Sequence, residues 1–343
     1  MKFIDLHSDT LMKLARKDAI GDLYENPNTS VSFKKMIEGG QMAQFFAVFL
    51  AEPEYFKKEN IYYDSPDEYV EGRIKYFKEQ VEKYSNIVAF AKNYEDLVEN
   101  DKAGKLSAFL TLEEGAPVDG SLEKLEYFYD EGVRLITLTW NFENCFGFPN
   151  SFDPEIMSKG LKPFGIEAIQ RMEELGMLVD VSHLSDAGFY DCAKILKKPF
   201  IASHSNAREL TEHPRNLTDD MIKVMANSGG VSGLNFCPVF LDREQVNVSD
   251  NWVNIDGDDR KNLIVYSRVS DMIKHLNHMK NKGGEDFVAL GSDLDGIGGE
   301  LEVNEAKDFE LLFDALRKDG WSENQIEKLA YKNAKRVIRE VLK

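Results

Sequence analysis

The sequence predicts an α/β fold in which one (β/α)8 TIM-like barrel takes up the whole chain, residues 1–343. Short apolar runs alternate with longer amphipathic stretches, a pattern typical of parallel strands joined by crossover helices. The runs number eight, enough to close a barrel. With 43% hydrophobic residues and no repeat or linker, the chain can bury one full barrel core. We therefore expect a single domain.

Each predicted strand is a run rich in apolar residues that polar or turn-forming residues follow. FIDLH is the first of these runs and FVALG is the last. The eight predicted strands cover residues 3–7, 44–50, 107–113, 135–139, 178–182, 200–203, 230–235 and 287–291.

Between the strands, apolar residues recur at helical spacing in residues 65–85, 121–131, 165–175 and 269–280. Residues 322–342 begin with a capping box from Ser322 to Gln325 and keep an apolar stripe, so we expect a final helix there. Two longer connections, residues 141–160 and 238–261, are expected to be loops that build a pocket at the barrel rim.

The net charge of -18 leaves no basic stripe for binding phosphate backbones or anionic lipids. No charged segment followed by an apolar run marks a secretory signal. No apolar stretch reaches the roughly 18 residues of a transmembrane helix. We therefore expect a cytoplasmic protein that has neither nucleic acid nor membrane as a partner. Three widely spaced cysteines without a CxxC pair predict reduced thiols.

Five of the apolar runs end on residues that can bind a metal ion. These runs are FIDLHSD, FLTLEE, LVDVSH, FIASH and VALGSDLD. Parallel strands bring their carboxyl ends to one rim of a barrel, where such side chains converge. The candidate ligands are His7, Asp9, Glu113, His183, His204 and Asp293. A barrel with this set is of the metal-dependent hydrolase type.

The ligands divide into two half-sites. His7 and Asp9 are two residues apart, so in an extended segment both point to one side. By themselves they are also typical of a strand-end histidine beside a helix-capping aspartate. His183 and His204 end consecutive predicted strands and should lie side by side. Glu113 is the best candidate to bridge two ions about 3.5 to 4 Å apart.

Glu114 is the rival bridge, but strand alternation should turn it the other way. Zinc is the default ion for imidazole and carboxylate ligands, although manganese or cobalt suit the same residues. Asp293 is placed to accept a proton from water or to hold a substrate ammonium group. His275 and His278 are expected on a solvated or partly packed helix face, and His213 in a structural or rim-lining loop.

The chain closely resembles the membrane-dipeptidase (renal dipeptidase, peptidase M19) family of the amidohydrolase superfamily. The resemblance covers nearly the whole chain, in the form of a bacterial-type member without anchoring signals. It rests on the ordered segments FIDLHSDTL, GGQMAQFFAVFL, LEEGAPVDGSLEKLEYFYDEGVRLITLT, GLKPFGIEAIQRMEELGMLVDVSHLS, ASHSNAREL, HPRN, LGSDLDGI and GWSENQIEKLAYKNAKRV.

The resemblance implies a zinc-dependent dipeptidase with two Zn²⁺ ions and a bridging water or hydroxide as the nucleophile. One ion would be bound by His7, Asp9 and Glu113, and the other by Glu113, His183 and His204. Arg215 in HPRN would pair with the carboxylate of a dipeptide substrate, and Asp293 would contact its free amino group. L-D dipeptides are expected among the substrates, and a homodimer is expected from the resemblance alone.

Two departures from the family pattern concern the substrate. Eukaryotic members carry a histidine associated with the scissile carbonyl after TLT, where this chain has Trp140 and Asn141. That role does not transfer to Trp140; Asn141 or Asn144 takes it, or the metal ions do more of the work. Residues 115–117, GAP, replace a second histidine of the mammalian pattern. Trp140 and Asn141 are nonetheless expected to border the substrate.

The loops also contain many aromatic residues, which either line an apolar side-chain pocket or simply pack the loops. They are Trp140, Phe142, Phe146, Phe148, Phe236 and Phe240. Two other functions fit the same ligand set: an amidohydrolase acting on N-acyl amino acids, lactones or phosphoesters, and a metal-binding homologue without turnover.

Overall fold

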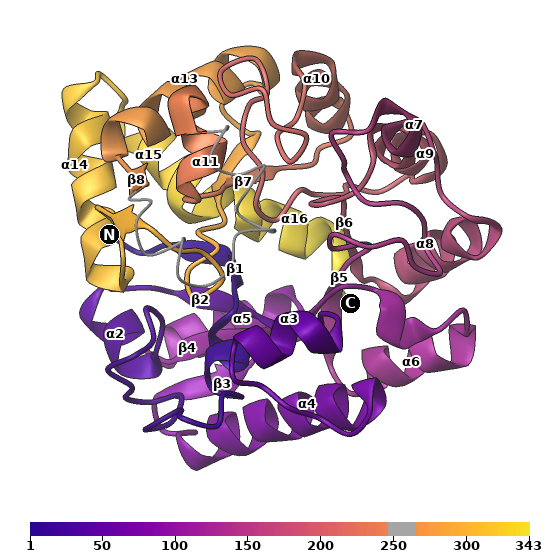
Figure 1. Cartoon of the computed structure of the whole chain (residues 1–343). Helices are drawn as coiled ribbons and strands as arrows, with labels where there is room; N and C mark the ends of the chain where they lie inside the picture. The colour runs from indigo at the N-terminus through magenta and orange to yellow at the C-terminus, as the bar shows by residue number, and fades with distance from the viewer. Residues whose placement is uncertain (246–264) are drawn as a thin grey trace.

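Seven parallel strands form the centre of the computed structural model, which describes residues 1–245 and 265–343 (Figure 1). Their order is β6-β5-β4-β2-β1-β9-β7. The strands are β1 (Ile4–Ser8), β2 (Ala43–Phe49), β4 (Leu106–Glu113), β5 (Val133–Thr137), β6 (Leu178–Asp180), β7 (Ser232–Leu234) and β9 (Val288–Leu290). Each coincides with a predicted strand to within a few residues.

The eighth predicted strand, residues 200–203, closes the ring as two isolated bridges. Asp180 of β6 pairs with Ile201, and Ala202 pairs with Ser232 of β7, both in parallel. The backbone N–H of Val181 donates to the carbonyl of Ile201 at 2.8 Å, and that of Ala202 donates to the carbonyl of Val231 at 3.1 Å. The two edges of the sheet are therefore joined, and the predicted barrel is confirmed.

Two short pairings were not predicted. β3 (Val88–Phe90) pairs with β4 outside the ring, and β8 (Tyr266–Ser267) pairs with β10 (Glu300–Leu301). Runs of two or three residues carry too little periodicity to be recognised in a sequence.

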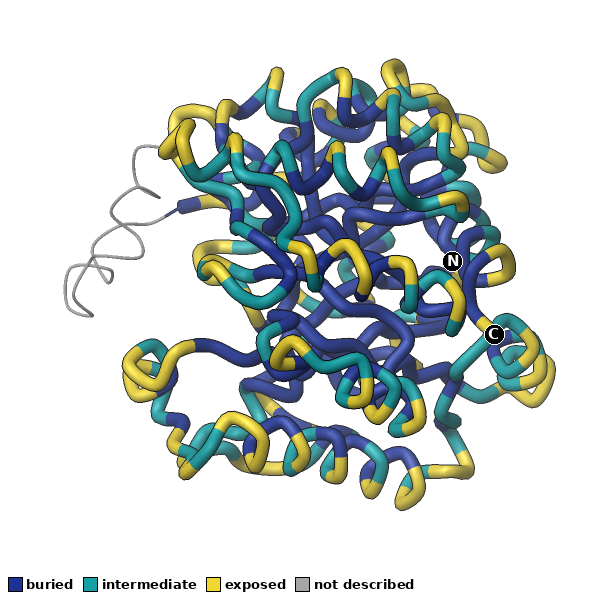
Figure 2. Tube along the Cα trace, turned by 90° about the vertical axis from the view of Figure 1, so that its right-hand side faces the viewer, coloured by how far each residue is buried: buried dark blue, intermediate teal, exposed yellow. Residues whose placement is uncertain are grey.

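Helices surround the barrel, and their outer faces are exposed (Figures 1 and 2). The longer ones are α4 (Pro66–Lys83), α5 (Tyr94–Lys102), α6 (Leu122–Asp130), α8 (Pro163–Leu175), α9 (Asp186–Ile195), α10 (Asp219–Asn227), α13 (Val269–Gly283) and α14 (Phe309–Lys318). The four predicted internal helices correspond to α4, α6, α8 and α13. Helices α5, α9, α10 and α14 were not among the predicted segments, although Asn93, Ser185 and Thr218 cap three of them with side-chain acceptors.

The predicted final helix is interrupted. Its capping box at Ser322 is present, but α15 (Glu323–Glu327) passes through a π-helical turn, Lys328–Lys332, into α16 (Asn333–Val341). At the end of this turn the Asn333 side chain donates to the carbonyls of Glu285 and Val288, each at 2.8 Å. These bonds tie the end of the chain to the segment that enters β9.

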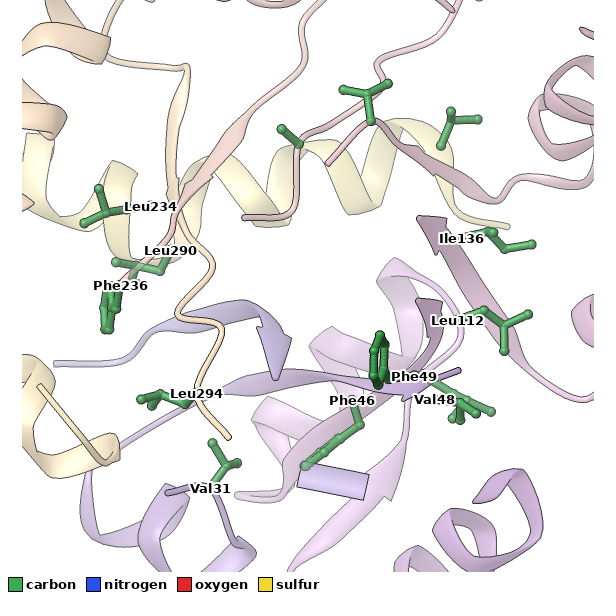
Figure 3. Packing of buried hydrophobic residues seen from close by; sticks show 14 of the residues in the cluster. Val31, Phe46, Val48, Phe49, Leu112, Ile136, Leu234, Phe236, Leu290 and Leu294 are labelled. Carbon is green, nitrogen blue, oxygen red and sulfur yellow. The ribbon is translucent and has the colours of Figure 1, made fainter. Parts of the chain in front are cut away.

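The core has two parts. Outward-facing strand residues such as Phe46, Leu112 and Leu290 pack against the helices (Figure 3). Inward-facing residues such as Leu6, Phe45 and Phe109 pack together with apolar residues of α16, among them Val337 and Ile338. Because α16 fills one end of the barrel, a site can open only at the other end, where the strands have their carboxyl ends.

Short helices and loops build that open rim. The short helices are α1 (Thr10–Lys13), α2 (Phe33–Glu38), α3 (Pro53–Lys58), α7 (Pro154–Met157) and α11 (Pro238–Leu241). Most of the predicted loop 141–160 is irregular apart from α7, whereas the predicted loop 238–261 contains α11 and lies outside the described residues from 246 onward. No helix in the described parts of the chain is long and apolar enough to cross a bilayer.

Candidate metal centre and substrate site

The predicted ligands converge at the carboxyl ends of the barrel strands. His7 lies in β1, Glu113 ends β4, and His183 and Asp293 follow β6 and β9 by three residues. His183 and Asp293 have positive φ angles of 67° and 62°, which are uncommon for residues with side chains and are typical of functional sites. Local backbone strain therefore turns these two side chains into the site.

Glu113 stands between the two predicted half-sites. Its Oε2 lies 3.2 Å from His7 Nε2, which is 3.4 Å from Asp9 Oδ2. Its Oε1 lies 3.2 Å from His183 Nε2 and 3.6 Å from His204 Nε2. Each carboxylate oxygen thus faces a different half-site, which is the arrangement that a bridging ligand requires.

Hydrogen bonds behind the ligands fix which nitrogen of each imidazole faces the site. Asp180 accepts hydrogen bonds from Thr137 Oγ1 at 2.6 Å, Ser203 Oγ at 2.5 Å, Ser182 N at 2.9 Å and Ser203 N at 2.8 Å. Because Ser203 donates its only hydroxyl proton to this carboxylate, it must accept from His204 Nδ1, 2.7 Å away. His204 Nε2 is left with its lone pair directed into the site.

Asn141 orients His183 as Ser203 orients His204, by accepting a hydrogen bond from Nδ1 of the imidazole. Its Oδ1 lies 3.2 Å from His183 Nδ1, and an amide oxygen can only accept, so Nδ1 carries the proton. The lone pair of His183 Nε2 then faces that of His204 Nε2 at 3.1 Å. Two lone pairs this close repel each other unless a cation lies beside them.

Unpaired buried atoms show that these residues fit metal ions. His7 Nε2 and Asp9 Oδ1 are buried and have no hydrogen-bond partner in the described part of the chain. Burial raises the pKa of Glu113, and the nearby Asp9 carboxylate raises it further. Burial also lowers the pKa of His183 and His204 well below the usual value, so both imidazoles are neutral, as metal ligands must be. The crowded carboxylates and the neutral imidazoles of His183 and His204 are typical donors to divalent cations.

The metal-facing residues open into a cavity of about 610 Å³, a size typical of small-molecule sites. Arg215 lines this cavity and is 5% exposed. Its guanidinium donates to Ser205 Oγ and the His204 carbonyl, while Nε has no partner. No carboxylate of the described residues forms an ion pair with it. The cavity therefore holds a buried cation without an ion-pair partner among the described residues.

Asp293 lines the same cavity. Its Oδ2 accepts a hydrogen bond from Asn235 Nδ2 at 2.9 Å, and its Oδ1 lies 3.9 Å from His7 Nε2. Burial raises the pKa of this carboxyl group above its usual value. Asp293 can therefore hold a proton or an ammonium group near neutral pH.

Glu114 points away from the metal-facing residues, as alternation predicts. With φ at 80°, it accepts hydrogen bonds from the backbone N–H of Ala116 and Trp140 and from the side chain of Asn144. Asn144 is thereby committed to holding the loop. Of the two asparagines considered as substitutes for the family histidine, only Asn141 lines the cavity.

The aromatic residues of the loops divide between cavity and core. Trp140, Phe142 and Phe240 line the cavity, whereas Phe146 and Phe236 are fully buried in the core. The pocket-lining alternative is therefore wrong for Phe146 and Phe236, because their rings pack beneath the rim.

The remaining histidines have partners away from the ligand set. His278 pairs with Asp219, and His213 lines the cavity while accepting from the Arg215 backbone N–H. The expected solvated or partly packed position is wrong for His275. This ring is 1% exposed, accepts from Ala207 N and lies 3.0 Å from the Leu241 carbonyl.

Three features of the site were missed in the sequence. Gly296 has space for no side chain, since a Cβ would lie 2.1 Å from Asp9 Oδ2 and 2.7 Å from Asp293 Oδ1. Asp180 and Asn235, which orient ligands and Asp293, carry no motif of their own. The only available signal was their position within or next to the predicted strands that carry site residues.

An α/β barrel with a buried histidine and carboxylate cluster at its carboxyl rim, opening into a cavity, belongs to the class of metal-dependent hydrolases. The family model described as membrane dipeptidase (peptidase family M19) matches residues 1–343. The chain therefore belongs to the membrane dipeptidase family and is a hydrolase of the dipeptidase type, as the resemblance implied.

Individual relatives agree with this membership. An uncharacterized dipeptidase of Schizosaccharomyces pombe is 32% identical over 99% of this chain and 80% of its own length. An uncharacterized protein of Klebsiella pneumoniae is 35% identical over 71% of this chain and 86% of its own length.

Solved structures show the same fold. A metallo peptidase from Rhodobacter sphaeroides, liganded with a phosphinate mimic of L-Ala-D-Ala, has a TM-score of 0.85 and is 22% identical. The match covers 99% of each chain. A second M19 dipeptidase structure has a TM-score of 0.84 and is 23% identical over 100% of this chain and 99% of its own.

Proposed function

We propose that this protein is a dinuclear zinc dipeptidase that hydrolyses dipeptides with free amino and carboxyl ends, including L-D dipeptides. The proposal rests mainly on the orientation of Glu113, because its two carboxylate oxygens face two separate half-sites that each contain histidine. His7 and Asp9 would hold one ion and His183 and His204 the other, with Glu113 shared. Two divalent cations there would supply Lewis acidity to the hydrolysis.

The chain itself binds the two ends of the substrate. Arg215 is a buried cation that forms no ion pair with a carboxylate of residues 1–245 or 265–343, so a substrate carboxylate would supply its missing partner. Asp293, held by Asn235 through Oδ2, keeps Oδ1 free for the substrate ammonium group or for a proton bound for the leaving amine. Asn141 accepts from His183 through Oδ1, which leaves its Nδ2 hydrogens for a substrate carbonyl.

These two anchors restrict the length of the substrate. A tripeptide is one residue longer than a dipeptide. If its amine binds Asp293 and its first peptide bond lies at the metal-facing residues, its carboxylate extends beyond Arg215. The inclusion of L-D dipeptides is supported by the ligand mimicking L-Ala-D-Ala in the Rhodobacter sphaeroides structure, which shares this fold.

The test is a comparison of initial rates for zinc-loaded protein on L-Ala-L-Ala, L-Ala-D-Ala, N-acetylated and C-amidated dipeptides, and a tripeptide. We expect cleavage of both free dipeptides, with rates at least about 100-fold lower when either end is blocked, because a buried charge is then left unpaired. His183→Ala, which removes a ligand, is expected to abolish activity, and metal analysis by mass spectrometry should give two ions per wild-type chain.

If only N-acetylated compounds are hydrolysed, the dipeptidase assignment is wrong and the protein is a hydrolase of N-acyl amino acids. Metal binding without hydrolysis of any substrate would favour the homologue without turnover. The cytoplasmic location remains a prediction. The homodimer, which was inferred from the family resemblance alone, is also a prediction, and light scattering of the purified protein tests it.

A further inference from the structure

A wall of aromatic side chains lines one side of the cavity. It consists of Phe49 at the end of β2, Tyr55 in α3, and Trp140 and Phe142 after β5. The ring of Trp140 lies 4.9 Å from that of Phe49, 5.1 Å from that of Tyr55 and 5.5 Å from that of Phe142. We call these four residues the aromatic wall.

The aromatic wall is held in place and remains open to the cavity. The Trp140 backbone N–H donates to Glu114 at 2.8 Å, and the contacts of its ring with Phe49 and Tyr55 are edge-on at 76° and 69°. Such contacts are favourable aromatic geometry and restrict the indole. Tyr55, Trp140 and Phe142 are only partly buried, so apolar surface is left facing the cavity.

Strand order places this wall across the barrel mouth from the two substrate anchors. Around the ring, β2, β4 and β5 lie opposite the bridging segment, β7 and β9. Arg215 follows the bridging segment, and Asp293 follows β9. The backbone of a dipeptide stretched between Arg215 and Asp293 therefore runs along one side of the cavity, and a side chain can extend to the other.

A different set of rings surrounds Arg215. Its guanidinium lies 5.4 Å from the Phe240 ring, which is 4.6 Å from the His213 ring, and that ring is 5.1 Å from Phe152. A side chain on the residue whose carboxylate binds Arg215 would lie among these rings. The aromatic wall is thus left for the side chain of the other residue, at the amino end.

We infer that the aromatic wall selects dipeptides whose amino-terminal residue has a large apolar or aromatic side chain. This inference rests on the proposed dipeptidase function and adds its substrate class. The indole of Trp140 is the central element, because it contacts the three other members of the wall and lies 6.2 Å from the ring of His183. It therefore joins the apolar surface to the candidate metal centre.

The test compares kcat/KM for Phe-Ala, Ala-Phe and Ala-Ala, with the second residue in both L and D configurations. We expect Phe-Ala to exceed Ala-Ala by about 10-fold or more, because burial of a phenyl side chain in an apolar pocket is favourable by that order. Ala-Phe should gain less. Trp140→Ala should bring the Phe-Ala to Ala-Ala ratio close to one, whereas Trp140→Phe, which keeps an aromatic ring, should retain most of it.

Tyr127→Ala is the matched control, because Tyr127 is an aromatic residue 42% exposed on the outer helix α6. It should leave the ratio and both rates unchanged. If Trp140→Ala does not fold, as judged by circular dichroism, Tyr55→Ala replaces it with the same expected loss of ratio.

Two failures are distinguishable. If the zinc-loaded wild-type protein hydrolyses Ala-Ala but shows no preference for Phe-Ala, or if folded wall variants keep the preference, the inference about the wall is wrong and the dipeptidase stands. If no dipeptide is hydrolysed at all, the proposed function itself is wrong and the inference falls with it.

Discussion

The serine behind His204 offers a sharp test of the candidate metal centre. Ser203 Oγ donates to Asp180 and accepts from His204 Nδ1 at 2.7 Å. In Ser203→Ala, the buried His204 Nδ1–H loses its acceptor, while Asp180 keeps its bonds from Thr137, Ser182 N and residue 203 N. The change therefore frees the imidazole of His204 to rotate or to change tautomer, without uncovering the carboxylate.

The expected magnitudes follow from these lost bonds. A buried donor left unpaired costs about 1–3 kcal/mol, and a hydrogen bond to a charged group contributes about 1.5–3 kcal/mol. We expect the free energy of unfolding of the metal-free protein to fall by about 3–5 kcal/mol. Loss of a group that orients a metal ligand lowers metal affinity by about 10–100-fold. We therefore expect Zn²⁺ to bind the half-site of His183 and His204 about 10–100-fold more weakly in Ser203→Ala.

Two measurements separate stability from metal binding. Urea unfolding of chelator-treated protein gives the free energy of unfolding, and titration with Zn²⁺ by calorimetry gives the two affinities. Ser107→Ala is the matched control, since Ser107 is a buried serine of β4 whose Oγ accepts one bond from Asn100, away from the ligand set. It should cost about 1 kcal/mol in stability and leave both affinities unchanged.

Folded Ser203→Ala protein with unchanged affinity at both half-sites would contradict this role of Ser203, because His204 would then be oriented without it. An equal loss in Ser107→Ala would also count against it, since the effect would follow from general destabilisation and not from the imidazole.

Three further predictions address other parts of the molecule. Gly296→Ala places a Cβ against Asp9 and Asp293, so mass spectrometry should show metal content falling toward one ion per chain in protein with unchanged circular dichroism. Arg215→Lys loses the guanidinium fork, so KM for free dipeptides should rise by about 10-fold or more, with little change for C-amidated ones. Burial lowers the pKa of His275 from 6.5 to about 4. The unfolded chain therefore protonates His275 at a higher pH than the folded protein does. As a result, the free energy of unfolding falls by about 3 kcal/mol as the pH decreases from 6.5 toward 4. Urea unfolding across this range should show that His275→Gln removes this part of the pH dependence.

The strands were predictable because burial on both faces produces continuous apolar runs, and each run ends where polar ligands begin. The same regularity identified His7, Glu113 and His204 as convergent residues. Helices α5, α9, α10 and α14 were not among the predicted segments, although the first three begin at residues whose side chains cap the helix. The π-helical turn at Lys328–Lys332 interrupts an otherwise regular stripe, so nothing local indicates it.

Roles that depend on contacts between distant segments were beyond the sequence. Asn141 was considered as a substitute for a family histidine, whereas the structure places its Oδ1 on His183 Nδ1. Gly296 gave no sign of its closeness to Asp9, since 287 residues separate them in the chain. Trp140 was expected to border the substrate, but its contacts with Phe49 and Tyr55 are visible only in the structure.

The barrel, the rim at which the site lies and the kinds of candidate ligand gathered there could all be predicted from the amino-acid sequence. Continuous apolar runs mark the strands, their alternation with helices implies parallel pairing, and the residues that end the runs give the ligand types; all three can be read along the chain. Three features can be seen only in the folded structure: which oxygen of Glu113 faces which imidazole, which nitrogen of His204 faces the site, and that Arg215 is buried without an ion pair to any described carboxylate. These depend on distances of about 3 Å between segments far apart in the chain, which only packing of the closed barrel sets.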